Sequence, residues 1–280
     1  MLTKLAALSL LVIVLAAQLG PLLVRYNPET IDLDQVLRPP SVEHPLGTDA
    51  LGRDLLSRLV CGARVSLGVG LLAAIVGTGL GLSLGALAGY LGGRLDEILM
   101  RLADLMLALP TLFLLIAVQS MVPPHLLTVA LVIALTRWMG LARLVRGQFL
   151  SLKEREFVQA ARAIGCTGRR IVLRHLLPNT SGQIAVSFSF TLAEAILIES
   201  ALSFLGLGFP ASQPSWGGML AEARASILAG AWWVVLFPGL MILLVTASVN
   251  LLADEWQAWP ALGFTARAAA ESTTVPPRRR

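Results

Sequence analysis

The chain alternates between long, mostly apolar stretches and shorter polar stretches rich in turn-forming residues. A helix needs roughly 20 apolar residues to cross the hydrocarbon core of a bilayer. Residues 5–24 carry no charge and predict a first membrane helix of that length. Five more stretches predict transmembrane helices at 65–90, 105–121, 125–149, 179–208 and 231–253. The pattern therefore predicts an all-α membrane protein with six transmembrane helices.

The first apolar stretch has a second interpretation. Lys4 precedes it, as a basic residue precedes the apolar region of a signal peptide. No convincing cleavage site occurs before Pro21, so we expect an uncleaved helix. Residues 1–64 are then the first helix with an outer loop, 65–253 a five-helix membrane core, and 254–280 a cytoplasmic tail that we expect to be disordered.

Composition and charge indicate how the spans are oriented. The apolar share of 56% is high, and the charged share of 14% is low, for a soluble domain. The net charge of +5 could indicate nucleic acid, but the basic residues cluster between apolar stretches, as the positive-inside rule describes. Residues 143–174 hold eight basic and two acidic residues and are expected in the cytoplasm, whereas 25–64 hold five arginines and six acids and are expected outside. Six spans then place both termini in the cytoplasm, and no nucleic-acid partner is expected.

Four glycines of the second apolar stretch, Gly77, Gly81, Gly85 and Gly89, recur every four residues. Residues four apart lie along one stripe of a helix. Small residues at this spacing let two helix backbones approach closely in lipid. We therefore predict a tightly packed neighbouring helix along this stripe.

The basic cytoplasmic segment is too polar to cross the membrane and predicts a helix–turn–helix outside it. Ser151 and Glu154 form a capping-box pattern at the start of the first helix. Gly165 can end that helix in the left-handed region. A second short helix is expected at 168–177, with Pro178 marking its end.

This segment, residues 151–178, resembles the EAA loop of ATP-binding-cassette (ABC) importer permeases, which has the pattern Glu-Ala-Ala-x3-Gly-x9-Ile-x-Leu-Pro. The spacing is the same throughout, with Gln159 in place of the glutamate and His175 in place of the isoleucine. The resemblance implies that the loop contains a coupling helix that docks on a cytoplasmic ATPase. The residues implied in that contact are Gln159, Ala160, Ala161, Gly165, Arg169, His175, Leu177 and Pro178.

Other stretches resemble the second, C-type subunit of the dipeptide, oligopeptide and nickel permeases; they lie at 46–54, 64–67, 88–93, 202–208 and 214–217. The resemblance implies a type I importer permease fold in the bacterial inner membrane. It also implies a heterodimer with a sister permease, two cytoplasmic ABC ATPases, an extracytoplasmic solute-binding protein and contact with membrane lipid. The implied cargo is a dipeptide or oligopeptide, with nickel or a metal chelate as the alternative.

The chain itself lacks the pattern of a nucleotide-binding loop. No G-x-x-x-x-G-K-[ST] sequence occurs, and no glycine is followed directly by lysine. We therefore expect ATP and Mg²⁺ to bind on partner chains, and no enzyme activity, cofactor or metal site on this chain. An intramembrane enzyme remains an alternative, although H-E-x-x-H is absent and no plausible Ser/His pairing stands out in the spans. A secondary transporter is another alternative, although the six spans show no obvious internal repeat.

Three residues are candidates for contact with substrate or binding protein. Glu194 and Glu199 lie in the fifth apolar stretch, where acids are costly and usually face a cavity or a partner. They could line the translocation path or serve a structural role, for example by pairing with an arginine. Trp216 lies in the last outer loop and could contact the binding protein or anchor the loop at the lipid headgroups.

Overall fold

The computed structural model describes the backbone of residues 2–272 and the side chains of residues 2–20 and 24–255. Every regular element in this part of the chain is a helix, and the one ladder contact there is an isolated bridge between Thr48 and Asp54. The prediction of an all-α fold is confirmed. Residues 273–280, the end of the tail expected to be disordered, lie outside the described residues.

Four helical segments are each long and apolar enough to cross a membrane alone. They are α1 (Leu2–Leu23), α2 (Leu55–Leu91), α9 (Leu177–Phe204) with the short helices that run into it, and α12 (Trp233–Ser272). Two bent pairs give two further spans if each pair is counted as one: α3 (Gly93–Ala108) with α4 (Thr111–Gln119), and α5 (Leu126–Ala134) with α6 (Trp138–Lys153). The chain is thus a multi-pass membrane protein with four to six spans among its described residues.

The third predicted span differs from the structure. Residues 93–104, which precede the predicted span at 105–121, already belong to α3, and the chain then bends by 88° before α4. Leu109 is extended there, with ψ 136°, and Pro110 precedes the first residue of α4. Proline disfavours the helical conformation of the residue before it and has no N–H to donate. Pro110 therefore breaks the helix instead of lying inside a continuous span.

The fourth predicted span is also bent, by 43° between α5 and α6. The N–H of Thr136 and that of Arg137 donate to carbonyls three residues earlier, at 3.0 and 3.1 Å, which tightens the turn. The Thr136 hydroxyl also donates to the Ile133 carbonyl, at 2.8 Å. Such local side-chain bonds compete with regular helix. The bend places Arg137 directly before the first residue of α6.

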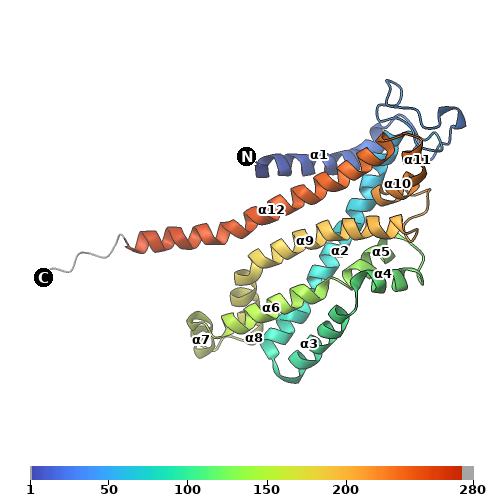
Figure 1. Cartoon of the computed structure of the whole chain (residues 1–280). Coiled ribbons are helices and arrows are strands. Elements are labelled where there is room, and N and C mark those ends of the chain that lie inside the picture. Colours follow the sequence, from blue (N-terminus) through green and yellow to red (C-terminus); the bar gives the residue numbers. More distant parts are fainter. Residues whose placement is uncertain (1, 273–280) are drawn as a thin grey trace.

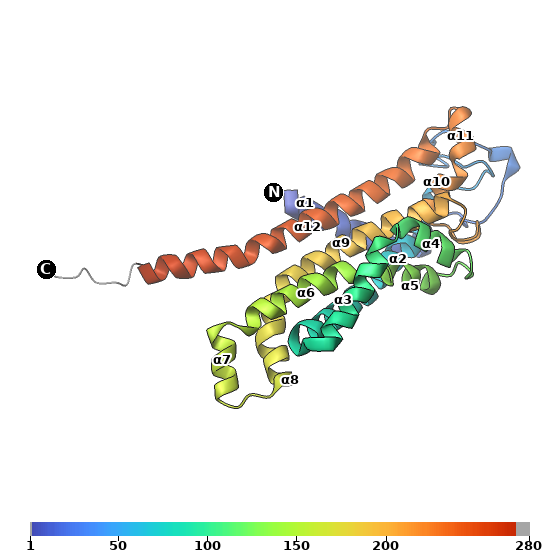
Figure 2. The same ribbon diagram turned by 60° about the horizontal axis from the view of Figure 1, so that its bottom comes forward.

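Helix α2 lies at the centre of the fold and packs against α1, α5, α6 and α9 (Figures 1 and 2). It begins ten residues before its predicted start, because Asp54 caps it. The Asp54 carboxylate accepts the Ser57 N–H at 2.8 Å and the Ser57 hydroxyl at 2.7 Å. Gly92, at φ +67°, follows its last turn.

The glycine stripe of α2 has the close neighbour that its spacing predicts. A Cβ at Gly81 would lie 2.7 Å from the Trp138 carbonyl oxygen, and one at Gly85 would lie 2.5 Å from that of Ala142. Both contacts are with the backbone of α6, which cannot move aside as a flexible side chain can. The stripe therefore lets α2 and α6 pack backbone to backbone.

Gly85→Ala is expected to lower the free energy of unfolding by about 1–3 kcal/mol, because the added methyl group overpacks this contact. Gly79→Ala is the matched control, since Gly79 lies on the same helix with nothing within 4 Å of its added Cβ. Both changes raise helix propensity equally. Denaturant titration of the purified chain in detergent measures the difference, and equal stability of the two variants would contradict the packing argument.

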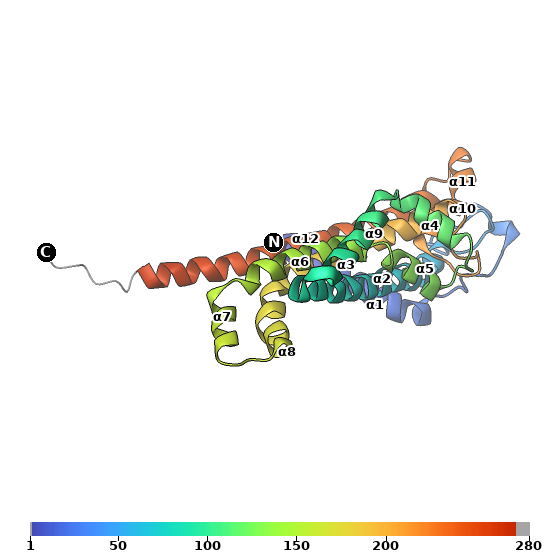
Figure 3. The same ribbon diagram turned by 90° about the horizontal axis from the view of Figure 1, so that it is seen from below.

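The described elements form an elongated bundle with different structures at its two ends (Figure 1). One end carries the polar loop of residues 24–54, which includes the short turn η1 (Leu33–Gln35), together with α10 (Trp216–Glu222) and α11 (Arg224–Leu228). The other end carries α7 (Glu156–Ala163) and α8 (Gly168–Ile171), which project sideways from the bundle (Figure 3). The outer loop expected at 209–230 thus contains two short helices.

The tail expected to be disordered from residue 254 is helical as far as the structure describes it. Helix α12 runs alongside α1 and continues beyond the bundle to Ser272 (Figures 1 and 2). The expectation was based on the proline and arginine residues at the end of the tail, but residues 254–272 are rich in alanine, which favours helix. They continue a helix that is already nucleated, which needs only favourable propagation.

Candidate functional site

The first helix of the predicted helix–turn–helix is present, but it begins later than expected. Helix α6 continues through Ser151 to Lys153, and α7 begins at Glu156 after an extended Arg155. The capping-box prediction is therefore wrong, because Ser151 lies inside α6 and cannot cap α7. No obvious helix breaker separates the two helices in the sequence, so charge and capping patterns alone misplaced the boundary.

The turn after α7 is built as predicted on Gly165, which has φ +82°. Its N–H donates to the Arg162 carbonyl at 2.9 Å, and the N–H of Cys166 donates to the Ala161 carbonyl at 3.0 Å. These two bonds satisfy carbonyls at the end of α7. The left-handed backbone of Gly165 therefore sets the direction in which the chain leaves α7.

The second predicted helix does not end at Pro178. Helix α8 continues through the π-helix η2 (Val172–Leu176) directly into α9, and Pro178 lies in the first turn of α9. Proline has no N–H to donate, and the π-helix directly before it changes the hydrogen-bond register of the helix at this point. The wider π turn carries the helix across this position. The projecting segment is thus continuous with a membrane span.

Both projecting helices are fixed to the membrane bundle by a shared apolar cluster. Val158 and Ala161 of α7, Ile171 of α8 and Leu176 are buried together with Phe149 of α6. A Cβ at Gly168 would lie 2.5 Å from the Tyr90 hydroxyl, so α8 also packs closely on the end of α2. Ala161 therefore packs inside this chain and is not available for the partner contact predicted for it.

The opposite side of α7 is exposed and partly apolar. Phe157, Ala160 and Ile164 follow one another at spacings of three and four residues, so they share one helix face, and Ile164 is 81% exposed. We call these three residues the α7 face. Of these three residues only Ala160 was predicted from the sequence, although the helical spacing of Phe157 and Ile164 around it was visible.

The remaining predicted coupling residues lie around this face. Gln159, Gly165, Arg169 and Pro178 are exposed, whereas His175 and Leu177 are partly buried. The His175 ring lies 6.4 Å from the Phe157 ring, centroid to centroid. The Gln159 amide donates to the Glu154 carbonyl of its own loop at 3.1 Å. The structure thus gathers the predicted residues into one projecting unit, with Ala161 on its inner side.

The two acids of α9 have different surroundings. Glu194 forms an ion pair with Arg137 at the α5–α6 bend and lines a cavity of about 260 Å³. Glu199 is buried, and it accepts hydrogen bonds from the hydroxyls of Ser203, at 2.8 Å, and Ser66, at 3.2 Å. Glu199 therefore links α9 to α2 inside the chain, whereas Glu194 faces an accessible space.

Trp216 is completely buried, so its predicted contact with a binding protein is wrong. Its indole N–H donates to the Leu59 carbonyl of α2 at 3.0 Å, and its backbone N–H donates to the Ser66 hydroxyl at 3.1 Å. The preceding Ser215 caps α10 by accepting the Gly218 N–H at 3.0 Å. Trp216 thus fixes α10 against α2 and presents no surface to a partner.

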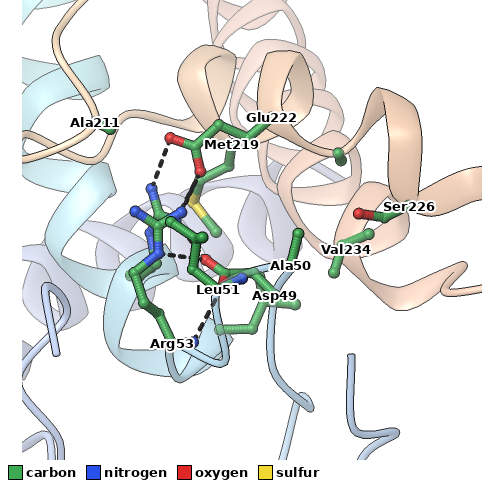
Figure 4. A pocket seen from close by; sticks show the side chains of 12 residues that line it. Asp49, Ala50, Leu51, Arg53, Ala211, Met219, Glu222, Ser226 and Val234 are labelled. Carbon is green, nitrogen blue, oxygen red and sulfur yellow. Dashed lines mark hydrogen bonds and ion pairs between the residues drawn. The ribbon is translucent and has the colours of Figure 1, made fainter. Parts of the chain in front are cut away.

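An ionic network that was not predicted from the sequence joins the outer loop to α10 (Figure 4). Arg53 binds Asp49 at 2.7 Å and also pairs with Glu222, and the buried Arg58 pairs with the same two acids. The network lines a cavity of about 270 Å³, whose other walls include Met219. The Asp49–Arg53 spacing was visible in the sequence, but the pairing with Glu222 joins segments far apart along the chain.

Comparison with known proteins gives a consistent result. Residues 81–259 match the family described as "Binding-protein-dependent transport system inner membrane component". The chain is 41% identical over 248 residues to the dipeptide transport system permease protein DppC of Bacillus subtilis. The aligned residues make up 89% of this chain and 78% of that protein. The chain is 38% identical to the oligopeptide transport system permease protein OppC of Bacillus subtilis, covering 90% and 83%. It is 39% identical to OppC of Mycobacterium tuberculosis, covering 88% and 85%.

Proposed function

The chain belongs to the family of inner-membrane components of binding-protein-dependent transport systems, and on this premise we propose that it is the transmembrane subunit of an ABC importer for peptides. The names of its relatives, which are dipeptide and oligopeptide permeases, support peptides over the nickel alternative. Family membership also favours this function over the two alternatives considered from the sequence, an intramembrane enzyme and a secondary transporter.

The α7 face is the observation that carries the coupling role. Exposed apolar residues on a helix that projects from the bundle are typical of a protein–protein contact. The same projecting segment carries exposed arginines at positions 155, 162, 169, 170 and 174, so an acidic groove is the complementary partner. We assign that groove to one of two cytoplasmic ATPase subunits, and these subunits hold ATP and Mg²⁺ because this chain has no phosphate-binding loop.

The connection of α8 to α9 gives the coupling a mechanical route. The projecting helices are packed on α6 and α2, and α8 continues into a membrane span. Movement of docked ATPases would therefore be transmitted to the bundle as a nearly rigid displacement. ATP binding can favour one state of the path only through a difference in its interaction with the two states.

The other partners follow from the two ends of the bundle. The basic end with α7 and α8 lies in the cytoplasm with both termini, by the positive-inside rule, and the end with α10 and α11 lies outside. A sister permease forms the second half of the translocation path in the bacterial inner membrane. A solute-binding protein delivers the peptide at the outer end, on surfaces other than the buried Trp216.

The proposed function predicts uptake of the dipeptide Ala-Ala that needs ATP and the binding protein together. The assembled importer, with its sister permease, ATPases and binding protein, is reconstituted in vesicles and supplied with labelled Ala-Ala. Uptake is expected only when ATP and the binding protein are both present. Accumulation of Ni²⁺ but not of Ala-Ala under these conditions would contradict the peptide cargo, and uptake of Ala-Ala without ATP would contradict the ABC mechanism.

A further inference from the structure

A small cavity lies where the two broken membrane segments approach α9. Its walls are formed by Thr111, Leu112 and Leu115 of α4, by Leu197 and Ile198 of α9, and by the pair Arg137 and Glu194. The cavity volume is about 260 Å³. Its lining is mostly apolar, and the two charged side chains are its main polar groups. Such a combination of apolar walls and a few convergent polar groups is typical of small-molecule sites.

The depth of the pair in the membrane makes its charges costly. Ten residues separate Glu194 from Phe204 at the end of α9, which corresponds to about 15 Å of helix. That distance is about half of the ~30 Å hydrocarbon core. Ionisable groups at this depth are expensive and usually serve a substrate or ion pathway. Both helix breaks, 88° before α4 and 43° before α6, occur beside this pair.

The pair is accessible from the cavity, unlike the other acid of α9. The Arg137 and Glu194 side chains are 24% and 47% exposed, whereas Glu199 is enclosed by hydroxyl groups. Among the described residues, Arg137 and Glu194 form no other ion pair. A guanidinium has five N–H donors, so one carboxylate leaves donors available for a second.

We propose that the Arg137–Glu194 pair is a binding station for the two charged termini of a free peptide during its passage through the membrane. The peptide carboxylate binds Arg137, and the peptide ammonium binds Glu194. In the empty state the two side chains neutralise each other. A zwitterion replaces each partner by a group of the same charge, so no unpaired charge is left in the apolar cavity. The station rests on the proposed function and adds to it a requirement for free termini.

This arrangement selects against peptides that lack terminal charges. A neutral ligand of the same shape can enter only by leaving the pair closed or by leaving both charges without partners, and unpaired charges at membrane depth are strongly unfavourable. Sites that bind a charged or polar group reject analogues lacking it far more strongly than apolar pockets reject a missing methylene. The preferred cargo of the station is therefore a short peptide with a free ammonium and a free carboxylate group.

The first test compares three variants in the reconstituted importer, with Ala-Ala as the transported peptide. Arg137→Gln and Glu194→Gln are each expected to lower uptake about tenfold, through loss of one charged hydrogen-bond partner. The double variant Arg137→Gln/Glu194→Gln distinguishes substrate binding from a structural ion pair, because it removes both charges and leaves none unpaired. The station predicts that the double variant stays as low as the single variants. Recovery of uptake in the double variant would overturn the proposal.

A matched control uses a second ion pair, formed by an arginine of the helix that follows Arg137. Arg143 of α6 pairs with Asp104 of α3, but neither residue lines the cavity. The double variant Arg143→Gln/Asp104→Asn is expected to keep wild-type uptake. A loss equal to that of the Arg137 and Glu194 variants would show a general sensitivity to lost ion pairs and would overturn the station.

The second test measures binding directly on the purified complex of the two permeases and their ATPases, without the binding protein. Ala-Ala is expected to raise the thermal midpoint of the wild-type complex, whereas cyclo(Ala-Ala), which has the same side chains and no termini, is expected to leave it unchanged. Equal shifts from both ligands, or an Ala-Ala shift that persists in the double variant, would overturn the station. Absence of Ala-Ala uptake by the wild-type importer would instead contradict the proposed function itself.

Discussion

Gly165→Pro is expected to abolish ATP-driven uptake while the chain still inserts in the membrane. Proline fixes φ near −65°, whereas Gly165 has φ +82°, so the turn between α7 and α8 cannot keep its shape. The variant also loses the N–H that donates to the Arg162 carbonyl. The α7 face would then point in another direction from the bundle, and the ATPases would lose their contact with it. The membrane spans lie outside this turn and should be unaffected.

The coupling measurement is stimulation of ATPase activity by the binding protein and peptide in reconstituted vesicles. Gly165→Pro should remove the stimulation, and the amount of inserted chain should stay at the wild-type level. Thr167→Pro is the matched control, because Thr167 lies in the same turn and its φ of −64° already suits proline. Full stimulation in Gly165→Pro, or equal loss in both variants, would contradict a role for the left-handed turn.

The sequence predicted the number and approximate place of the apolar segments, because span length depends on local composition alone. It did not predict where the segments break. Pro110 can be accommodated within a membrane helix when neighbouring groups satisfy the freed backbone, so its presence does not distinguish a kink from a break. The structure resolves this by packing α4 against α5 after an 88° bend. That choice depends on tertiary contacts, which no local pattern records.

In the candidate site too, features set by a single residue were predictable from the sequence, whereas features that depend on tertiary contacts were not. The Gly165 turn was predictable because one residue type determines a left-handed backbone. The pairing of Glu194 with Arg137 was left open, since the two residues lie on different helices and only the α5–α6 bend brings them together. Family resemblance identified the projecting loop but not which of its residues face inward. Ala161 is part of the matched pattern and is nevertheless buried against α6.

Trp216 gave the clearest error, and its correction predicts a large loss of stability. Tryptophan is common both at protein interfaces and in packed interiors, so the residue type alone did not separate the two roles. Trp216 is 0% exposed and is hydrogen-bonded to the Leu59 carbonyl. Trp216→Ala should lower the free energy of unfolding by about 3–5 kcal/mol, because it leaves a large cavity between α10 and α2.

Denaturant titration in detergent measures this loss, with Trp232→Ala as the matched control because Trp232 is 56% exposed. The control should change stability by less than about 1 kcal/mol, since substitutions away from packed sites usually have small effects. Trp216→Phe should fall between the two variants, because it keeps most of the buried volume and loses only the indole hydrogen bond to Leu59. If Trp216 served instead as a docking residue, Trp216→Ala would leave unfolding unchanged and weaken only the affinity for the binding protein. That outcome would contradict the buried position that joins α10 to the central helix.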